Sequence, residues 1–502
     1  MELLTFLLWM LIIGVTSGLY MLYSQMTYWS GKSVPYEKVT PIIGSLAPVF
    51  FRKKSFAEFI YEAYNKYKDA KYYGMMDFNT PTILVKDIDL LKDICIKNFD
   101  NNPNHKSFID ERMDPIMSKN VFSLRDERWK KVRATLSPSF TASKMKFMFN
   151  LVSKCADDFV KYLIDNPELI KSMEMKDAFT RYTNDVIATS AFGISVDSMR
   201  DRNNDFYLYG KDATSFDGIF KTFKFIFARF FPRFMKFLGF QFLSAKTDKF
   251  FKKLMHETVK MRDEKSIVRP DMIHLLMQAR DNDNGISIDI DDIIAQAFIF
   301  FLAGFDTTSS HMTFLFHLLA FNKDVQDKLY DEIQSLTDNG EITYEALLKM
   351  KYMDMVMHEA MRMYPPAVVT DRVCVTPFKL PPAMPGCKEI IVERDTIFWI
   401  PIYGIHMDPN YFPQPDKFDP ERFNDDNKDN ILPNTLIGFG LGPRKCIGER
   451  FAVMETKIII AKILKKFIIN PTDKTKEKIV FDKASFNIKN EGGVWLNFEL
   501  RK

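Results

Sequence analysis

Cysteine is scarce in this sequence, which limits how the chain can be stabilised. The 502 residues include five cysteines, at positions 95, 155, 374, 387 and 446. An odd number of scattered cysteines does not fit the disulfide framework that stabilises small secreted domains. We therefore expect the folded body to lie in a reducing compartment.

The chain also lacks a large net charge of either sign, and it lacks low-complexity sequence. Lysine and arginine exceed aspartate and glutamate by 69 to 65, which gives a formal net charge of +4. So mild an excess, with the signs mixed along the chain, argues against a nucleic-acid partner. The chain has no glycine/serine linker, internal repeat or biased tract. These absences favour one large domain over several small ones.

Charged residues are absent from 3–31, and the stretch up to about residue 23 is rich in leucine, isoleucine and phenylalanine. Apolar sequence of this length can cross a bilayer. A cleaved signal peptide would need a basic start and a small-x-small site, whereas this chain begins Met-Glu. Because lysines follow the stretch, the positive-inside rule places the body in the cytosol. The sequence predicts a transmembrane signal anchor at 1–24, a proline-containing linker at 25–45 with Trp29 suited to the bilayer interface, and one domain at 46–502.

A glycine-rich loop around a single cysteine has the clearest chemical signature. Residues 438–448 read GFGLGPRKCIG, and a helical pattern begins directly after them. Cys446 therefore stands at a helix N-terminus, where unpaired N–H groups and the helix dipole favour a thiolate over a thiol.

Three interpretations of this loop compete. A lone cysteine beside a tight turn is most often a buried structural residue. A dinucleotide-binding loop would need a third glycine at position 445, where Lys445 stands. An axial haem thiolate needs one cysteine, a backbone that approaches a flat ring, and a cation for a propionate. The pattern Phe439-x-x-Gly442-x-Arg444-x-Cys446-x-Gly448 supplies all of these.

A long apolar helix is predicted over 291–321, and it contains a local conflict. Gly304, Asp306 and Thr307 all weaken helix interiors. Conflicts of this kind tend to lie at functional sites. A hydroxyl that bonds back to the preceding turn would give only a bend, so the pattern alone leaves both interpretations open.

Two further pairs on predicted helices are ambiguous by themselves. Trp129 and Arg133 are four residues apart in the helix predicted at 126–136, so they share a face. Glu359 and Arg362 form an ordinary i,i+3 pair in the helix predicted at 352–364. Neither pair by itself indicates a functional site.

With the Cys446 loop as its strongest feature, the sequence resembles the cytochrome P450 superfamily. The family's other landmarks follow in order over about residues 30–500. The resemblance implies a mainly α fold with a smaller β portion, arranged as a triangular helical prism behind an N-terminal transmembrane anchor. One departure is Arg125-Asp126, which stands where many relatives have glycine, and we expect Asp126 to cap the helix that follows.

The resemblance also implies roles for particular residues. Cys446 would be the axial ligand of the iron of haem b. The haem would be held by Trp129, Arg133, Ala303, Arg372, Phe439, Arg444 and Gly448. Asp306 and Thr307 would relay protons, with the Thr307 hydroxyl as donor. Glu359, Arg362 and Arg422 would form a buried charged triad that locks the haem-loop region.

The implied activity is insertion of one oxygen atom from O2 into a small lipophilic substrate. Because the chain has no flavin or nicotinamide fingerprint, electrons would come from NADPH-cytochrome P450 reductase, with cytochrome b5 as a further candidate partner. Similarity to insect microsomal P450s of the xenobiotic-metabolising clan implies detoxification at the endoplasmic reticulum membrane. Hydroxylation of a hormone or fatty acid is an alternative. The intact Asp306-Thr307 pair disfavours a hydroperoxide isomerase, and the lack of an earlier histidine than His311 in the 291–321 helix disfavours a non-catalytic membrane haem protein.

Two basic stretches are candidates for partner contacts. Residues 219–243 combine ten phenylalanines with lysine and arginine and contain no acid. That composition fits a second contact with an anionic membrane surface, and core packing is the alternative. Lys130, Lys131, Lys445 and Arg450 would form a basic face for an acidic reductase.

Overall fold

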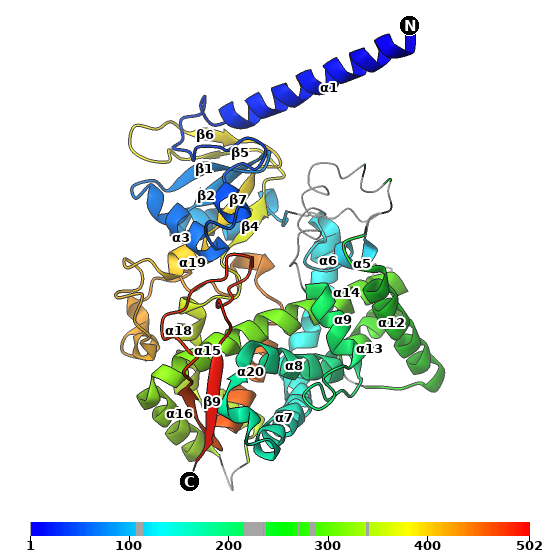
Figure 1. The fold of residues 1–502 in the computed structure, drawn as a ribbon, viewed down its shortest axis with the longest axis vertical. Coiled ribbons are helices and arrows are strands. Elements are labelled where there is room, and N and C mark those ends of the chain that lie inside the picture. Colours follow the sequence, from blue (N-terminus) through cyan, green and yellow to red (C-terminus); the bar gives the residue numbers. More distant parts are fainter. Residues whose placement is uncertain are drawn as a thin grey trace. The chain divides into compact units, whose positions relative to one another are not determined.

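A computed structural model describes residues 2–106, 114–214, 234, 237, 239, 241–269, 271–281, 288–337 and 341–501 (Figure 1). The chain forms two compact units. Unit 1 comprises Met1–Lys106, Ala367–Tyr411 and Pro433–Lys445, and unit 2 comprises Ser107–Pro366, Phe412–Leu432 and Cys446–Lys502. Helices predominate over strands, which confirms the predicted fold class. Most of the predicted membrane-contact segment 219–243 lies outside the described residues.

Unit 1 is built on a four-stranded sheet. Its strands run in the order β1 (Tyr72–Asp77), β2 (Thr80–Val85), β7 (Ile397–Ile400) and β4 (Thr370–Val373). β1 and β2 form an antiparallel hairpin, β2 and β7 are parallel, and β4 is antiparallel to β7. A smaller sheet pairs β5 (Phe378–Leu380) with β6 (Ile390–Val392).

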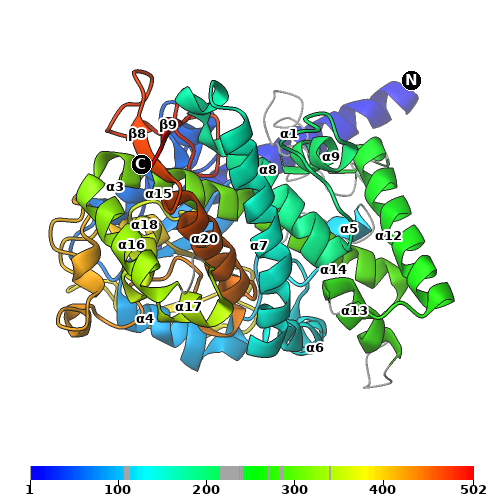
Figure 2. The ribbon, with the colours of Figure 1, turned by 90° about the horizontal axis from the view of Figure 1, so that it is seen from below.

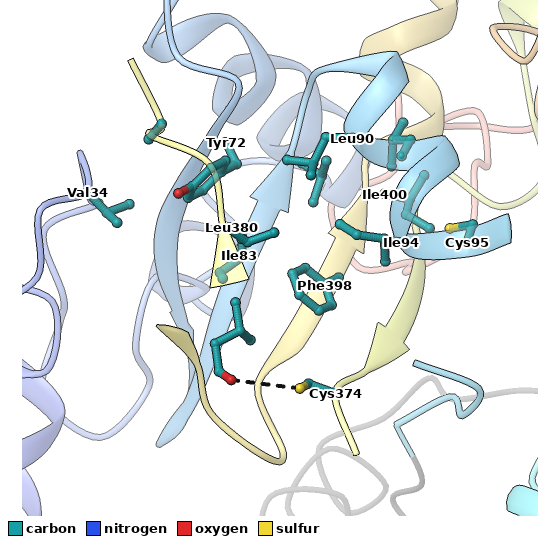
Figure 3. Packing of buried hydrophobic residues seen from close by; sticks show 14 of the residues in the cluster. Val34, Tyr72, Ile83, Leu90, Ile94, Cys95, Cys374, Leu380, Phe398 and Ile400 are labelled. Atoms are coloured by element: carbon teal, nitrogen blue, oxygen red, sulfur yellow. Dashed lines mark hydrogen bonds between the residues drawn. The ribbon is translucent and has the colours of Figure 1, made fainter. Parts of the chain in front are cut away.

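The core of unit 1 packs on this sheet (Figure 3). Ile83 and Phe398 come from neighbouring strands of the sheet, and Leu90 comes from α4 (Ile88–Lys92). Ile94 and Cys95 lie in the π-helix Asp93–Lys97, which continues from α4. Full burial of an aliphatic or aromatic side chain contributes about 1.5–3 kcal/mol. The core therefore fixes the backbone of this π-helix, which contacts the cysteine loop.

Unit 1 also contains the helices α2 (Ala47–Phe50) and α3 (Phe56–Lys66) before the sheet and α19 (Ile402–His406) after β7. α3 begins as its sequence requires. Ser55 accepts a hydrogen bond from the Glu58 N–H, and the Glu58 carboxylate accepts one from the Ser55 N–H. This capping box satisfies two backbone donors at the start of the helix.

The N-terminal helix α1 spans Glu2–Thr27. Its stretch Leu4–Thr27 is long and apolar enough to cross a membrane, with a mean hydropathy of 1.9. The division into anchor 1–24, linker 25–45 and domain 46–502 stays a prediction. The expectation that Trp29 lies at the bilayer interface is wrong. Trp29 is 2% exposed, and its Nε1 donates to the Met75 carbonyl of β1 at 2.8 Å.

Unit 2 is mainly helical (Figure 2). Its longer helices include α7 (Ala142–Asp165), α8 (Met175–Ile187), α12 (Ala245–Lys265), α16 (Lys323–Leu336), α18 (Lys351–Met363) and α20 (Glu449–Leu464). Shorter ones include α5 (Pro115–Ser118), α6 (Asp126–Leu136), α9 (Asp205–Thr214), α13 (Met272–Asp281) and α17 (Tyr344–Lys349). Helices α7 and α20 pack side by side. A sheet in the order β3 (Met173–Glu174), β9 (Trp495–Leu500) and β8 (Phe467–Pro471) completes the unit.

The long apolar helix predicted over 291–321 is confirmed, but it is continuous rather than interrupted. It consists of α14 (Ile290–Ala303), a π-helix at Gly304–Thr308 and α15 (Ser309–Phe321). Most of it is buried inside unit 2, where α8 packs against it. The predicted conflict is therefore accommodated by a π-bulge, a form that recurs at functional sites.

Candidate functional site

The cysteine loop begins in unit 1, where two glycines fix its path. Gly440 and Gly442 have φ angles of 83° and 73°, a region that L side chains rarely adopt. A Cβ atom on Gly442 would lie 2.1 Å from the Cys95 carbonyl oxygen. Gly442 therefore allows the loop to pass directly against the π-helix of the unit 1 core.

Cys446 belongs to unit 2 and lies three residues before α20. Its side chain is exposed. The helix N-cap, Gly448, brings no side-chain hydrogen bond to the first turn. The helix dipole thus acts on Cys446 from an N-terminus whose N-cap is a glycine, and a helix N-terminus favours a thiolate.

A cation on helix α6, Arg133, lies close enough to the Cys446 sulfur to interact with it electrostatically. Burial lowers the pKa of the Arg133 guanidinium, and the nearby Cys446 opposes this by favouring its charged form. Trp129, one turn earlier, is 3% exposed. The expectation that Asp126 caps this helix is wrong, because the N-cap is Arg125 and makes no side-chain cap. Asp126 instead adopts a φ of 48°, the region that glycine occupies readily.

Two of the predicted haem-binding arginines lie in unit 1. Arg444 donates from Nε to the Pro103 carbonyl at 2.7 Å. Arg372 is 1% exposed and donates to the carbonyls of Asp371 and Leu441, at 2.6 and 2.8 Å. Its Nε is buried and has no hydrogen-bond partner. A buried N–H donor without a hydrogen bond is unfavourable, and a haem propionate would provide the acceptor that Arg372 Nε lacks.

The remaining haem-binding predictions concern Phe439, Gly448 and Ala303. Phe439 is partly buried in unit 1, and Gly448 begins α20 in unit 2. Ala303 ends α14 with its side chain exposed. In unit 2, an exposed cysteine lies just before a helix and near a cation. In unit 1, a buried arginine has an N–H donor without a hydrogen-bond partner. Both features fit a thiolate-ligated haem. Their roles stay predictions.

Sequence reasoning missed a pair in unit 1 beside Arg372, formed by the buried His105 and the partly buried Asp371. His105 Nδ1 lies 2.9 Å from Asp371 Oδ1, and the Lys106 N–H donates to Asp371 Oδ2 at 2.6 Å. Burial would raise the pKa of the Asp371 carboxyl, but His105, Lys106 and Arg372 hold it below its usual value. His105 and Asp371 are 266 residues apart, so no local pattern could have paired them.

On the long helix, Ala303 and Thr307 are exposed although most of the helix is buried. The Thr307 hydroxyl donates to the Ala303 carbonyl one turn earlier. This is the back-bond that sequence reasoning left open as a simple bend. With its proton directed at Ala303, the Thr307 oxygen has lone pairs left to accept a hydrogen bond, and its role in proton relay stays a prediction.

Asp306 is held on the other side of the bulge by residues that the sequence did not indicate. Its Oδ1 accepts from Lys176 Nζ at 2.8 Å and its Oδ2 from Asn487 Nδ2 at 2.8 Å. Lys176 also donates to Ser309 and Ser310, at 2.8 and 2.7 Å. Burial would raise the pKa of the Asp306 carboxyl, but Lys176 and Asn487 outweigh it and the pKa is lowered. Asp306 and Thr307 thus have separate hydrogen-bond partners.

The structure brings the three predicted triad residues together inside unit 2. Glu359 and Arg362 are both fully buried, with Arg362 Nε 2.7 Å from Glu359 Oε2. Arg422 Nε reaches Glu359 Oε1 at 3.0 Å. Arg362 also donates to the Pro415 carbonyl at 2.8 Å, and Arg422 to the Pro413 carbonyl at 3.0 Å. The triad therefore ties α18 to the segment before Pro420.

Comparisons with known proteins agree with these observations. The sequence model of the family described as "Cytochrome P450" matches residues 34–496. The chain is 46% identical to "Cytochrome P450 9e2" of Blattella germanica, over 94% of each chain. It is 37% identical to "Probable cytochrome P450 9f2" of Drosophila melanogaster, over 94% of this chain and 95% of that one. It is 33% identical to "Cytochrome P450 6k1" of Blattella germanica, over 94% and 93%.

Proposed function

The chain belongs to the cytochrome P450 family, and from this premise we propose that it oxidises small lipophilic foreign compounds at the endoplasmic reticulum membrane. As a family member it is a monooxygenase with a cysteine-ligated haem, and it receives electrons from a redox partner. The proposal adds haem b, NADPH-cytochrome P450 reductase as the donor, cytochrome b5 as a further donor, and detoxification as the role. The observation that carries it is Cys446 at the start of α20 in a chain that the family matches from 34 to 496.

In this proposal Cys446 is the iron ligand. When bound, the haem supplies the activation of O2, and a thiolate ligand favours cleavage of the O–O bond. Trp129 and Arg133 lie one turn apart on α6 and would donate to one propionate. Arg372 would give its unused Nε donor to a propionate, and Arg444 would supply a second cation. Phe439, Gly448 and Ala303 would line the ring.

The polar groups of the bulge would control protons. Lys176 keeps Asp306 ionised, so the Asp306 carboxylate would act as a hydrogen-bond acceptor that orients polar groups beside the bulge. The Thr307 oxygen, whose own proton is committed to Ala303, would accept a hydrogen bond from a water on the exposed side of the helix. Thr307 would then position that water rather than donate directly.

The electron donor would dock on basic side chains around Cys446. Lys130, Lys131 and Arg450 are exposed in unit 2, and Lys445 is exposed in unit 1. Charge complementarity mainly raises association rates and is screened by salt. Turnover supported by reductase should therefore slow as ionic strength rises, while turnover driven by an added peroxide should not.

Reconstitution of the full-length chain with NADPH-cytochrome P450 reductase in liposomes tests the role. We expect NADPH-dependent oxidation of apolar foreign compounds such as pyrethroids. Lauric acid and steroid precursors, assayed under the same conditions, represent the alternative of endogenous hydroxylation. Faster turnover of a fatty acid or steroid than of every foreign compound would replace detoxification with that alternative.

A further inference from the structure

The two partners of the Asp306 carboxylate differ in how firmly they are held. Lys176 Nζ donates to the Asp306 carbonyl, to Asp306 Oδ1 and to the hydroxyls of Ser309 and Ser310, all at 2.7 to 2.8 Å. Asp306 Oδ2 accepts from Asn487 Nδ2 at 2.8 Å. Lys176 is partly buried, whereas Asn487 is exposed, and this is its one side-chain hydrogen bond within the described chain. Because water readily replaces the hydrogen bond of an exposed amide, Asn487 is the partner that Asp306 can exchange.

Asn487 lies at the end of a loop whose base is fixed. Phe481 and Asn490 form a β-bridge across this base. Ile488, next to Asn487, is 4% exposed and secures the returning strand. Residues 483–487 consist of turns and bends, and most of their side chains are exposed. We call residues 483–487 the loop tip. Few buried contacts hold the loop tip, so it belongs to the part of unit 2 that opens most easily.

The base of the loop and Lys176 are attached to the same residue, Glu174. The Glu174 carboxylate accepts from the backbone N–H groups of Lys176 and Asp177, at 3.2 and 2.7 Å, and so caps α8. The Val494 N–H, just after the loop, donates to Glu174 Oε1 at 3.3 Å. Lys176 and the base of the loop therefore share one frame. Movement relative to Asp306 is left to the loop tip.

The charge of Asp306 favours water in the place of Asn487. Burial would raise the pKa of the Asp306 carboxyl, but Lys176, Asn487 and Lys489 lower it, so the group is ionised. An ionised carboxylate accepts about four hydrogen bonds, which is more than Lys176 and Asn487 supply. The Asp306 side chain is 26% exposed, so solvent already adjoins it. A water that donates to Oδ2 can therefore replace the amide at small cost.

We propose that Asn487 is a positioning residue that gates the access of water to Asp306, and that movement of the loop tip opens this gate. With the tip in place, Asn487 occupies Oδ2. With the tip displaced, a water donates to Oδ2 and joins the polar groups that Lys176 holds together at the bulge. The gate opens and closes in rapid equilibrium before protons are used. The inference rests on the proposed function, because it assumes that Asp306 serves the proton supply of the oxidation.

Substitutions at position 487 test the gate in the full-length holoenzyme with reductase, assayed on the compound that it oxidises fastest. Asn487→Lys makes a charge-assisted bond to Asp306 and should hold the tip closed. Proton supply then limits more of the turnover, so the rate should fall several-fold and its solvent isotope effect should rise. Asn487→Leu removes the donor, and it should keep at least the native rate with a smaller solvent isotope effect. Asn487→Gln keeps the amide and should resemble the native chain.

Lys483→Leu is the matched control, because Lys483 is exposed on the same loop tip, four residues before Asn487. It should leave both the rate and the solvent isotope effect unchanged. A normal haem spectrum shows that each variant has folded. An Asn487→Leu variant that is slower than the native chain would overturn the proposal, and so would an Asn487→Lys variant with the native isotope effect.

Hydrogen exchange, followed by mass spectrometry without substrate or reductase, tests the contact independently of oxidation. Backbone amides in 482–490 should exchange faster in Asn487→Leu and slower in Asn487→Lys than in the native chain, because the bond to Asp306 restrains the loop tip. Equal exchange in all three proteins would overturn the proposal. If no compound is oxidised at all, the proposed function fails, and the exchange rates still decide whether Asn487 holds the tip on Asp306.

Discussion

Lys176 Nζ lies 2.8 Å from Asp306 Oδ1 and joins α8 to the π-bulge of the long helix. The two residues are 130 positions apart, so the pair exists only in the fold. The same ammonium bonds the hydroxyls of Ser309 and Ser310 on the next turn. Lys176 thereby fixes both the charge of Asp306 and the path of the bulge.

Lys176→Met should shift the acid limit of catalysis to higher pH. In the native chain the folded pKa of Asp306 is lowered, so its pairing adds stability above the ordinary aspartate pKa and loses it as pH falls through the lower folded value. Without the cation, burial raises this pKa, and Asp306 takes up a proton at higher pH. The measurement is product formed per NADPH against pH. Lys171→Met, which breaks an exposed pair with Glu168, is the control, and an acid limb that does not move contradicts the account.

Thr307→Ala should uncouple NADPH consumption from product formation. The variant loses the oxygen that would hold water on the exposed side of the helix, so reducing equivalents should leave as hydrogen peroxide. Thr307→Ser keeps the hydroxyl and the back-bond to Ala303, and it should stay close to native coupling. Peroxide yield per NADPH separates the two variants. Equal peroxide from both would remove Thr307 from the proton path.

Glu359→Gln should destabilise unit 2 by about 3–5 kcal/mol, because it leaves the buried Arg362 and the partly buried Arg422 without their carboxylate. Urea unfolding and haem content per protein measure the effect. Lys328→Ala breaks the surface pair with Glu421 and should change stability by about 1 kcal/mol or less. If the two variants unfold at the same urea concentration, the triad does not lock this region.

Gly442→Ala should prevent haem incorporation. The added methyl would lie 2.1 Å from the Cys95 carbonyl oxygen and would also strain a φ of 73°. Gly386→Ala carries similar strain at a φ of 87° but has nothing within 4 Å. That control should cost only about 1–2 kcal/mol, the price of the left-handed conformation. Equal haem content in the two variants would show that the contact with Cys95 is unimportant.

The features that could be predicted are those set by residues close together in the sequence. The helix at Asp126–Leu136 was located to the residue, and the Cys446 loop was recognised from its own spacing. The sequence also predicts strands at 71–76 and 82–86 around a turn at 79–81. The hairpin of β1 and β2 forms there, but its turn lies at Phe78-Asn79, and Pro81 is inside β2. Phe78 adopts a φ of 54°, which no residue preference at that position would indicate.

Contacts made through the fold could not be predicted. The partners of Asp306, the pairing of His105 with Asp371 and the burial of Trp29 all join residues far apart in the sequence. Trp29 shows why composition misled. An aromatic residue after an apolar helix is typical of a bilayer interface. Here Gly74 instead provides a site for the indole on β1.

The reduced-minus-oxidised spectrum in carbon monoxide tests the central claim, that Cys446 ligates haem iron as a thiolate. The purified full-length protein should show the red-shifted Soret maximum of a thiolate-ligated ferrous carbonyl haem. Cys446→Ala should lose that maximum, and Cys155→Ala, a cysteine of α7 in the same unit, should retain it. A native protein without the thiolate maximum, or a Cys446→Ala variant that keeps it, would contradict the account.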